Sequence, residues 1–337
     1  MALSKVFSLD DPAACQAVFP SADVQLFPTG KGNFHAGITQ VGMTRIWTHR
    51  IHISLPQINT VAAKPGRKSV GFLTECNSSS LLDCGLEVRH GDIVINRSDV
   101  VHQRSDANFH YGTVSLPTDD LAAAADSMLG RCLPETSHKS IVRPPSALMS
   151  RLLDLHKIIG QLARHTPDIL ELPEVTRALE TELTRLLVSC LAEGHGLELT
   201  TTHCRQESML SRFAEFLKAN PDQPLYITDI CAALGVAERT LRASCEKHLG
   251  MGPIHYLNLR RMHMVRRALR HSDPSKATVT KIVTDHGFWE LGRFSVAYRT
   301  LFGELPSATL RQPKYNAAMV SCPSQPLPSP LNVGRSA

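Results

Sequence analysis

The stretch Gly287–Arg311, GFWELGRFSVAYRTLFGELPSATLR, is the strongest indication of the structure of the last third of the chain. It combines a glycine turn with a helix whose apolar residues recur at helical spacing and whose polar side carries arginine. A segment of the same design, LGVAERTLRASCEKHLGMGPIHYLNLR, begins earlier, at Leu234. Two short helices joined by such a turn form a helix-turn-helix, whose second helix lies in the major groove of DNA. The chain is therefore expected to carry two DNA-reading units.

In the first unit, residues 227–234 are predicted as a short helix with Thr228 as its cap, Gly235 as the turn and residues 237–249 as the reading helix. Since Leu241, Cys245 and Leu249 form the apolar face of the reading helix, its polar residues must point away from the core. Those residues are Glu238, Arg239 and Arg242. Arginine there can bond guanine edges or grip phosphate.

The second unit repeats this plan, with a first helix over residues 280–286, a turn at Gly287 and a reading helix over residues 290–302. Its turn is predicted to be one residue longer. The residues left near the exposed side are Arg293, Val296 and Arg299. Between the units, residues 254–271 read as one continuous helix, about 27 Å long at ~1.5 Å per residue. Such a rod suits reading helices that enter successive major grooves, about 34 Å apart. Five arginines line this connector: Arg260, Arg261, Arg266, Arg267 and Arg270.

Residues 208–312 resemble the AraC/XylS family of bacterial transcription regulators. The family's carboxy-terminal motif is matched by Gly287-Phe288, Phe294, Tyr298-Arg299, Phe302-Gly303, Pro306 and Arg311. Leu305 and Leu310 depart from it, at positions that concern the packing of the last helix.

The resemblance places base-contacting positions at Arg239, Arg242 and Ala243 in the first reading helix and at Leu291, Gly292, Arg293 and Val296 in the second. Because Leu291 and Gly292 offer no side-chain hydrogen bonds, we expect the second unit to be less selective or to rely on thymine methyl groups. The complete set of candidate DNA-binding residues is Glu238, Arg239, Thr240, Arg242, Ala243, Glu290, Leu291, Gly292, Arg293, Val296 and Arg299.

The first part of the chain is predicted to be rich in strands. Residues 45–53 alternate polar and apolar side chains, and short apolar runs separated by turn-formers follow up to Leu116. This spacing favours a sandwich or small barrel. Family members of this length often carry a jelly-roll barrel followed by helices, which implies a ligand-sensing or dimerisation domain. The expected fold class is thus α+β: an amino-terminal jelly-roll-like β-barrel with a helical hairpin, then an all-α domain with two helix-turn-helix units.

Two heptad-like seams predict the helical hairpin. The first is Leu148, Leu152, Leu155, Ile159 and Leu162, and the second is Leu172, Val175, Leu179, Leu183, Leu186 and Cys190. Seams this short are typical of a packed hairpin, and either a core-covering or a dimer-forming role remains open, with a homodimer favoured. The predicted boundaries are residues 1–197 for the first domain, 198–207 for a linker, 208–313 for the DNA-binding domain and 314–337 for a disordered tail.

A small barrel can hold one small ligand. Candidate lining residues are Trp47, His49, Phe72 and Arg97, although Trp47 and Phe72 also suit a plain core. No metal site, cofactor or catalytic residue is predicted, because the histidines lack the ligand spacing of metalloenzymes and the phosphate-loop and nucleophile-elbow motifs are absent.

Charge supports a nucleic-acid partner. Residues 208–313 hold 15 Lys and Arg against 9 Asp and Glu, a net of +6, whereas residues 1–207 hold 19 against 22. The nine scattered cysteines form no CxxC pair, and no apolar run suggests a membrane helix or signal peptide, so a cytoplasmic protein is expected.

The favoured hypothesis is a regulator, not an enzyme, that binds double-stranded promoter DNA, contacts RNA polymerase, usually as an activator, and responds to a small-molecule effector. One alternative is a barrel enzyme fused to a DNA-binding domain, which stoichiometric metal binding by the first domain would favour. Another is an architectural DNA binder without ligand, which a ligand-induced rise in thermal midpoint would exclude.

Overall fold

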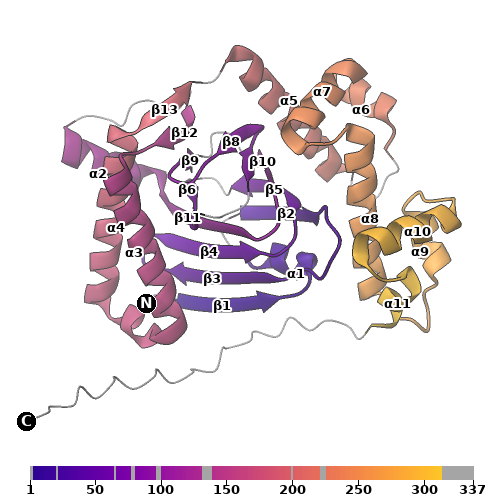
Figure 1. The fold of residues 1–337 in the computed structure, drawn as a ribbon, viewed down its shortest axis with the longest axis horizontal. Coiled ribbons are helices and arrows are strands. Elements are labelled where there is room, and N and C mark those ends of the chain that lie inside the picture. The colour runs from indigo at the N-terminus through magenta and orange to yellow at the C-terminus, as the bar shows by residue number, and fades with distance from the viewer. Residues whose placement is uncertain are drawn as a thin grey trace, which may run out of the picture.

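The computed structural model describes residues 3–19, 22–63, 66–76, 80–95, 100–130, 139–198, 200–220 and 225–312. It has an amino-terminal domain of two antiparallel sheets with helices and a carboxy-terminal domain of helices alone (Figure 1). This confirms the mixed fold with an amino-terminal sheet domain and a carboxy-terminal helical domain. The expected tail, residues 314–337, lies outside the described ranges.

The larger sheet contains, in spatial order, β1 (Leu3–Leu9), β3 (Ala36–Gly42), β4 (Trp47–Ile53), β11 (Phe109–Pro117), β6 (Arg67–Leu73), β9 (Ile93–Ile95), β12 (Lys139–Arg143) and β13 (His195–Glu198). The smaller sheet contains β2 (Ala22–Pro28), β5 (Gln57–Ala63), β10 (Val100–Ser105), β7 (Leu81–Asp83) and β8 (Leu86–Val88). In the described part of the chain neither sheet closes on itself, so the predicted barrel is not confirmed.

One face of the larger sheet packs against the smaller sheet. Side chains alternate between faces along a strand, so Ile51 and Ile53 of β4 point inward together with Tyr111 of β11. They meet Leu26 of β2 and Leu81 of β7 from the other sheet. The short helix α1 (Pro12–Ala17), capped by Asp11, covers the edge of this core.

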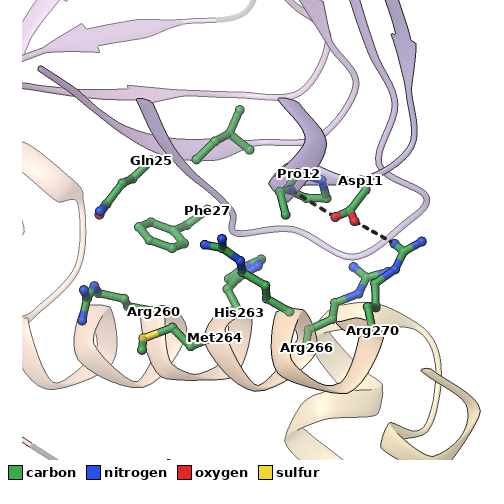
Figure 2. A pocket seen from close by; sticks show the side chains of 12 residues that line it. Asp11, Pro12, Gln25, Phe27, Arg260, His263, Met264, Arg266 and Arg270 are labelled. Atoms are coloured by element: carbon green, nitrogen blue, oxygen red, sulfur yellow. Dashed lines mark hydrogen bonds and ion pairs between the residues drawn. The ribbon is translucent and has the colours of Figure 1, made fainter. Parts of the chain in front are cut away.

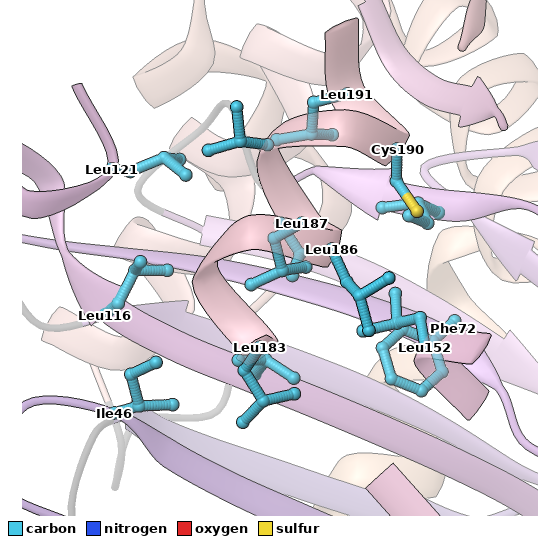
Figure 3. Close-up of a cluster of buried hydrophobic side chains, with 14 of the residues drawn as sticks. Ile46, Phe72, Leu116, Leu121, Leu152, Leu183, Leu186, Leu187, Cys190 and Leu191 are labelled. Carbon is cyan, nitrogen blue, oxygen red and sulfur yellow. The ribbon is translucent and has the colours of Figure 1, made fainter. Parts of the chain in front are cut away.

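The opposite face of the larger sheet is covered by helices. These are α2 (Thr118–Leu129), α3 (Ser146–His165), the 3-10 turn η2 (Pro167–Glu171) and α4 (Pro173–Glu193). Figure 3 shows leucines of α4 pointing at Ile46, Phe72 and Leu116 of the sheet side. Apart from Leu172, which is exposed, and Val175, which is half-buried outside this cluster, the predicted seam residues lie in or against this core. The helical hairpin is therefore confirmed, and its seams are used for packing within the chain.

The carboxy-terminal domain comprises α5 (Thr201–Ala219), α6 (Ile227–Leu234), α7 (Glu238–Leu249), α8 (Pro253–His271), α9 (Val279–Asp285), α10 (Leu291–Phe302) and α11 (Pro306–Arg311). One apolar core joins α5, α6, α7 and the first half of α8, and a second joins the other half of α8 to α9, α10 and α11. Residues 201–207 of the expected linker are the first turns of α5, because Thr200 caps a helix whose apolar face begins there.

The two domains pack against each other. Phe27 of β2 and Ile58 of β5 belong to the same apolar core as α5, α7 and α8. His102 of β10 donates a hydrogen bond from Nε2 to the carbonyl of Leu210 in α5, at 3.1 Å. His263 of α8 donates in the same way to the carbonyl of Pro28, at 2.9 Å. The helical domain thus packs against the smaller sheet of the amino-terminal domain.

Candidate nucleic-acid interface

The first helix-turn-helix unit consists of α6, a turn at Gly235 and α7. Gly235 has φ +65°, a left-handed conformation that glycine adopts without strain, and it ends α6. Tyr226, and not Thr228, occupies the N-cap position of α6, without a capping hydrogen bond from its side chain. The helix starts at Ile227, two residues earlier than a Thr228 cap requires. Leu241, Cys245 and Leu249 are fully buried and fix the rotation of α7, as predicted.

That rotation leaves all five predicted residues of α7 exposed: Glu238, Arg239, Thr240, Arg242 and Ala243. Arg242 donates from Nη2 to Glu238 Oε1 at 2.8 Å, one helical turn away. Such an exposed pair contributes little to stability, so the guanidinium can exchange the carboxylate for another acceptor at low cost. Arg239 lies on the same exposed surface.

The second unit consists of α9, a turn at Gly287 and α10. Thr278 caps α9 by accepting the backbone N–H of Lys281 at 3.2 Å. Gly287 has φ +79°. Phe294, Tyr298 and Phe302 bury the inner face of α10, and the Tyr298 hydroxyl lies 2.9 Å from Thr309 Oγ1 in α11. These contacts orient α10 in the way that leucine and cysteine orient α7.

The six predicted residues of the second unit are likewise exposed: Glu290, Leu291, Gly292, Arg293, Val296 and Arg299. Arg293 lies 2.8 Å from Glu290 in a surface ion pair. The prediction omitted Trp289, which stands in the turn just before α10 with 75% of its surface exposed. The preceding residue, Phe288, packs against the core instead, so the sequence of the turn did not distinguish its two aromatic residues.

The connector α8 is one helix, as predicted, but its arginines do not form a row on a solvated face. Arg260 is buried and donates from Nη2 to the carbonyl of Leu217 at 2.9 Å. Arg266 pairs with Glu304 at 3.2 Å and Arg270 with Asp11 at 3.4 Å. Arg261 is half-buried over the ring of Phe288, which leaves Arg267 as the exposed member of the five. The amino-terminal domain and α11 cover the faces that the sequence pattern left open.

A cavity of about 180 Å³ lies between α8 and the strand β2. Figure 2 shows Arg260, His263, Met264, Arg266 and Arg270 projecting from α8 toward Gln25, Phe27 and Asp11. Burial lowers the pKa of His263 to about 4, so its imidazole is neutral at physiological pH. The positive charge of this cavity comes from its arginines and is opposed by the carboxylate of Asp11. Sequence reasoning missed it because its two walls are distant along the chain.

A second cavity, of about 90 Å³, lies between the two sheets. Of the four predicted ligand-lining residues, His49 borders it, with Nδ1 3.1 Å from Thr113 Oγ1 and a pKa lowered to about 4 by burial. Phe72 points to the other face of the larger sheet, where its ring meets His156 of α3. Trp47 is stacked under the guanidinium of Arg67 and does not line the cavity, and Arg97 lies outside the described residues. Of the three candidates that the structure describes, only His49 lines this cavity.

Within the described ranges, no group of three or more His, Cys, Asp and Glu side chains is placed to hold a metal ion. None of the helices there has the length and apolar character needed to cross a bilayer.

Comparison with known proteins finds matches to the part of the chain that holds the reading units. The model of a helix-turn-helix domain matches residues 230–312, which contain α7, α8, α9, α10 and α11. The XylDLEGF operon transcriptional activator of Pseudomonas putida is 35% identical over 107 residues, which is 32% of this chain and 33% of the activator. The probable thc operon regulatory protein of Rhodococcus erythropolis is 35% identical over 97 residues, 29% of each chain. The chain thus matches about a third of the length of these relatives.

A search of solved structures finds similarity to the AraC-like transcriptional activator CuxR, at 16% identity and a TM-score of 0.41 over 85% of this chain and 100% of that one. The two relatives found by sequence are named as operon regulators, in agreement with the expectation of a regulator.

Proposed function

We propose that this chain, a member of the AraC/XylS family by its carboxy-terminal helix-turn-helix domain, is a transcriptional activator that binds promoter DNA in sequence-specific fashion. The observation that carries the proposal is the exposure of all eleven candidate DNA-binding residues, which lie on α7, on α10 and at the N-cap of α10. Each of these helices is held by its own buried core, so the exposed faces are presented on rigid supports. The surplus of positive charge in residues 208–313 adds attraction to phosphate.

The two units are proposed to recognise the DNA bases in different ways. α7 presents Arg239, Thr240 and Arg242, which can hydrogen-bond base edges. Of the candidate positions at the start of α10, Leu291, Gly292 and Val296 have no polar side chain to do so. Arginine bidentate to guanine is worth about 1–3 kcal/mol of discrimination. We therefore assign most of the hydrogen-bonded readout to the first unit.

Fluorescence anisotropy with fragments of the adjoining promoter region, at fixed salt and against excess unrelated DNA, tests this function. We expect specific binding to exceed non-specific binding at least 10³-fold. Arg242→Ala should weaken specific binding by about 1–3 kcal/mol and relax preference at one base, and Arg293→Ala should do the same at another position. Equal affinity for all DNA sequences would contradict the proposal.

The amino-terminal domain is proposed to sense a small-molecule effector and to form the homodimer. Two cavities qualify for the effector: the one between the two sheets beside His49, and the arginine-lined one between β2 and α8. An effector in the cavity between β2 and α8 would contact both domains and so favour one orientation of the reading units. A metabolite screen by thermal shift, repeated on His49→Ala and Arg270→Ala variants, separates the two sites, since each variant should abolish the shift of its own ligand.

We also propose that the protein activates transcription through a contact with RNA polymerase and that it is located in the cytoplasm. Transcription in vitro from a bound promoter should rise on addition of the protein with purified polymerase. A fall in transcription in that assay would contradict the assignment as an activator, while the proposed DNA binding would stand.

A further inference from the structure

The centre of the exposed face of α10 is apolar. Val296 lies opposite the buried residues Phe294 and Tyr298 and is 68% exposed. Gly292, one helical turn earlier, has nothing within 4 Å of the position that a Cβ would occupy. With Leu291, 36% exposed, and Trp289, 75% exposed, these residues make up what we call the apolar strip: Trp289, Leu291, Gly292 and Val296.

Two arginines of α10 adjoin this strip. Arg293 is engaged by Glu290 at 2.8 Å, and Arg299 lies a helical turn beyond Val296 toward the carboxyl end. The corresponding face of α7 is different, since it displays two arginines and a threonine. The two units therefore present different chemistry to their partner although they share one design.

The residues around the apolar strip indicate which partner binds it. It continues the surface that carries Arg293 and Arg299, so the partner that covers it is the anionic duplex bound by the same helix. In the major groove the thymine C5-methyl is the apolar group that distinguishes one base from the others. Gly292 allows the helix backbone to approach the base edges closely, and Val296 then places two methyl groups at that distance.

We propose that the second unit reads its part of the DNA site by contact of Val296 with the C5-methyl of a thymine, with Trp289 packed on the adjoining sugar-phosphate backbone. The inference rests on the proposed function and adds the identity of the recognised group. It predicts a thymine requirement in the half-site of α10 that does not depend on hydrogen bonds.

Replacing thymine by deoxyuridine, one position at a time, tests the inference because it removes the methyl and keeps every hydrogen-bonding group. With the wild-type chain we expect a 3- to 10-fold loss of affinity at one or two positions in the half-site of α10. Val296→Ala should bind the thymine site more weakly by a similar factor and should no longer distinguish thymine from deoxyuridine there. Arg242→Ala, altered in the other unit, is the matched control and should retain the full deoxyuridine effect.

Tryptophan emission gives an independent readout, since the chain contains two tryptophans and Trp47 is stacked under Arg67 in the amino-terminal domain. DNA should quench or shift the emission of the wild type and leave that of Trp289→Phe unchanged. Val296 is exposed, so circular dichroism of Val296→Ala should match the wild type.

The outcomes distinguish a failure of the thymine-methyl contact from a failure of the proposed function. Specific binding without any deoxyuridine effect, or an effect that persists in Val296→Ala, would overturn the thymine-methyl contact while the regulator assignment stands. Emission that responds to RNA polymerase and not to DNA would overturn the role of Trp289. Loss of all sequence-specific binding in the wild type would overturn the proposed function and this inference with it.

Discussion

At the scale of single residues, buried histidines fix how elements lie on the sheets. His156 of α3 is fully buried, donates from Nε2 to the carbonyl of His49 at 3.0 Å and meets the edge of the Phe72 ring. Desolvation lowers its pKa to about 4, and the nearby Arg50 acts in the same direction. The imidazole is therefore neutral in the folded chain, where it ties α3 to the larger sheet.

This makes stability depend on pH with a definite sign. The unfolded histidine, with a pKa near 6.5, binds more protons than the folded one between about pH 6.5 and pH 4, so stability falls as the pH drops through that window. His156 should contribute a loss of about 1 kcal/mol between pH 7.5 and pH 5.5. Urea unfolding of the wild type and His156→Gln at both pH values checks this. The stability advantage of the wild type should narrow by that amount at pH 5.5, and a constant difference would contradict it.

At the scale of elements, α8 joins the two reading units and also carries the contacts to the rest of the chain. Its buried Arg260 satisfies the carbonyl of Leu217 at the end of α5, while Arg267 is exposed. Removing a buried donor leaves its acceptor without a partner, whereas an exposed side chain can be lost with little effect on folding. The two arginines therefore have different roles despite their similar sequence context.

Arg260→Ala should lower the free energy of unfolding by about 1–3 kcal/mol. Its matched control, Arg267→Ala, should stay within about 0.5 kcal/mol of the wild type. If Arg267 contacts phosphate, that variant should also reduce the slope of log affinity against log salt by about 1. Denaturant titrations and salt-dependent anisotropy measure both. Equal stability of the two variants would contradict the assignment of Arg260 to the core.

Sequence periodicity predicted these elements well and their surroundings poorly. The spacing of Leu241, Cys245 and Leu249, and of Phe294 and Tyr298, gave the rotation of both reading helices because each buries one face in a local core. The arginines of α8 were misplaced because periodicity identifies the residues of a face and not the distant segment that covers it. Phe72 was assigned to the ligand side for a similar reason. The larger sheet is covered on both faces, so an apolar residue in it does not reveal which face it occupies.

At the scale of the whole molecule, the smaller sheet and the helical domain share one apolar core. Phe27 of β2 is buried against Tyr256 and His263 of α8, with ring centroids 6.3 and 5.6 Å apart. Ion pairs of Arg270 with Asp11 and of Lys218 with Asp23 flank it. Since the reading units are attached to α8, a change in the contact between the smaller sheet and α8 can alter the position of both units.

Phe27→Ala should destabilise the chain by about 3–5 kcal/mol and split its unfolding into separate transitions of the two domains. Leu3→Ala, at an exposed position on β1, is the control and should leave a single transition near the wild-type midpoint. Differential scanning calorimetry distinguishes the outcomes. A single unshifted transition for Phe27→Ala would show that the domains are not coupled through this contact.

Hydroxyl-radical footprinting of the full chain on its specific DNA site shows whether both reading helices bind one duplex, because it reports where each helix lies. With α7 and α10 joined by the single helix α8, we predict two protected regions on one face of the duplex. Their centres should lie about one helical turn, or roughly 34 Å, apart. Arg242→Ala should weaken one region and Val296→Ala the other. A single protected region, or uniform protection that is indifferent to sequence, would contradict the account of two reading units acting side by side.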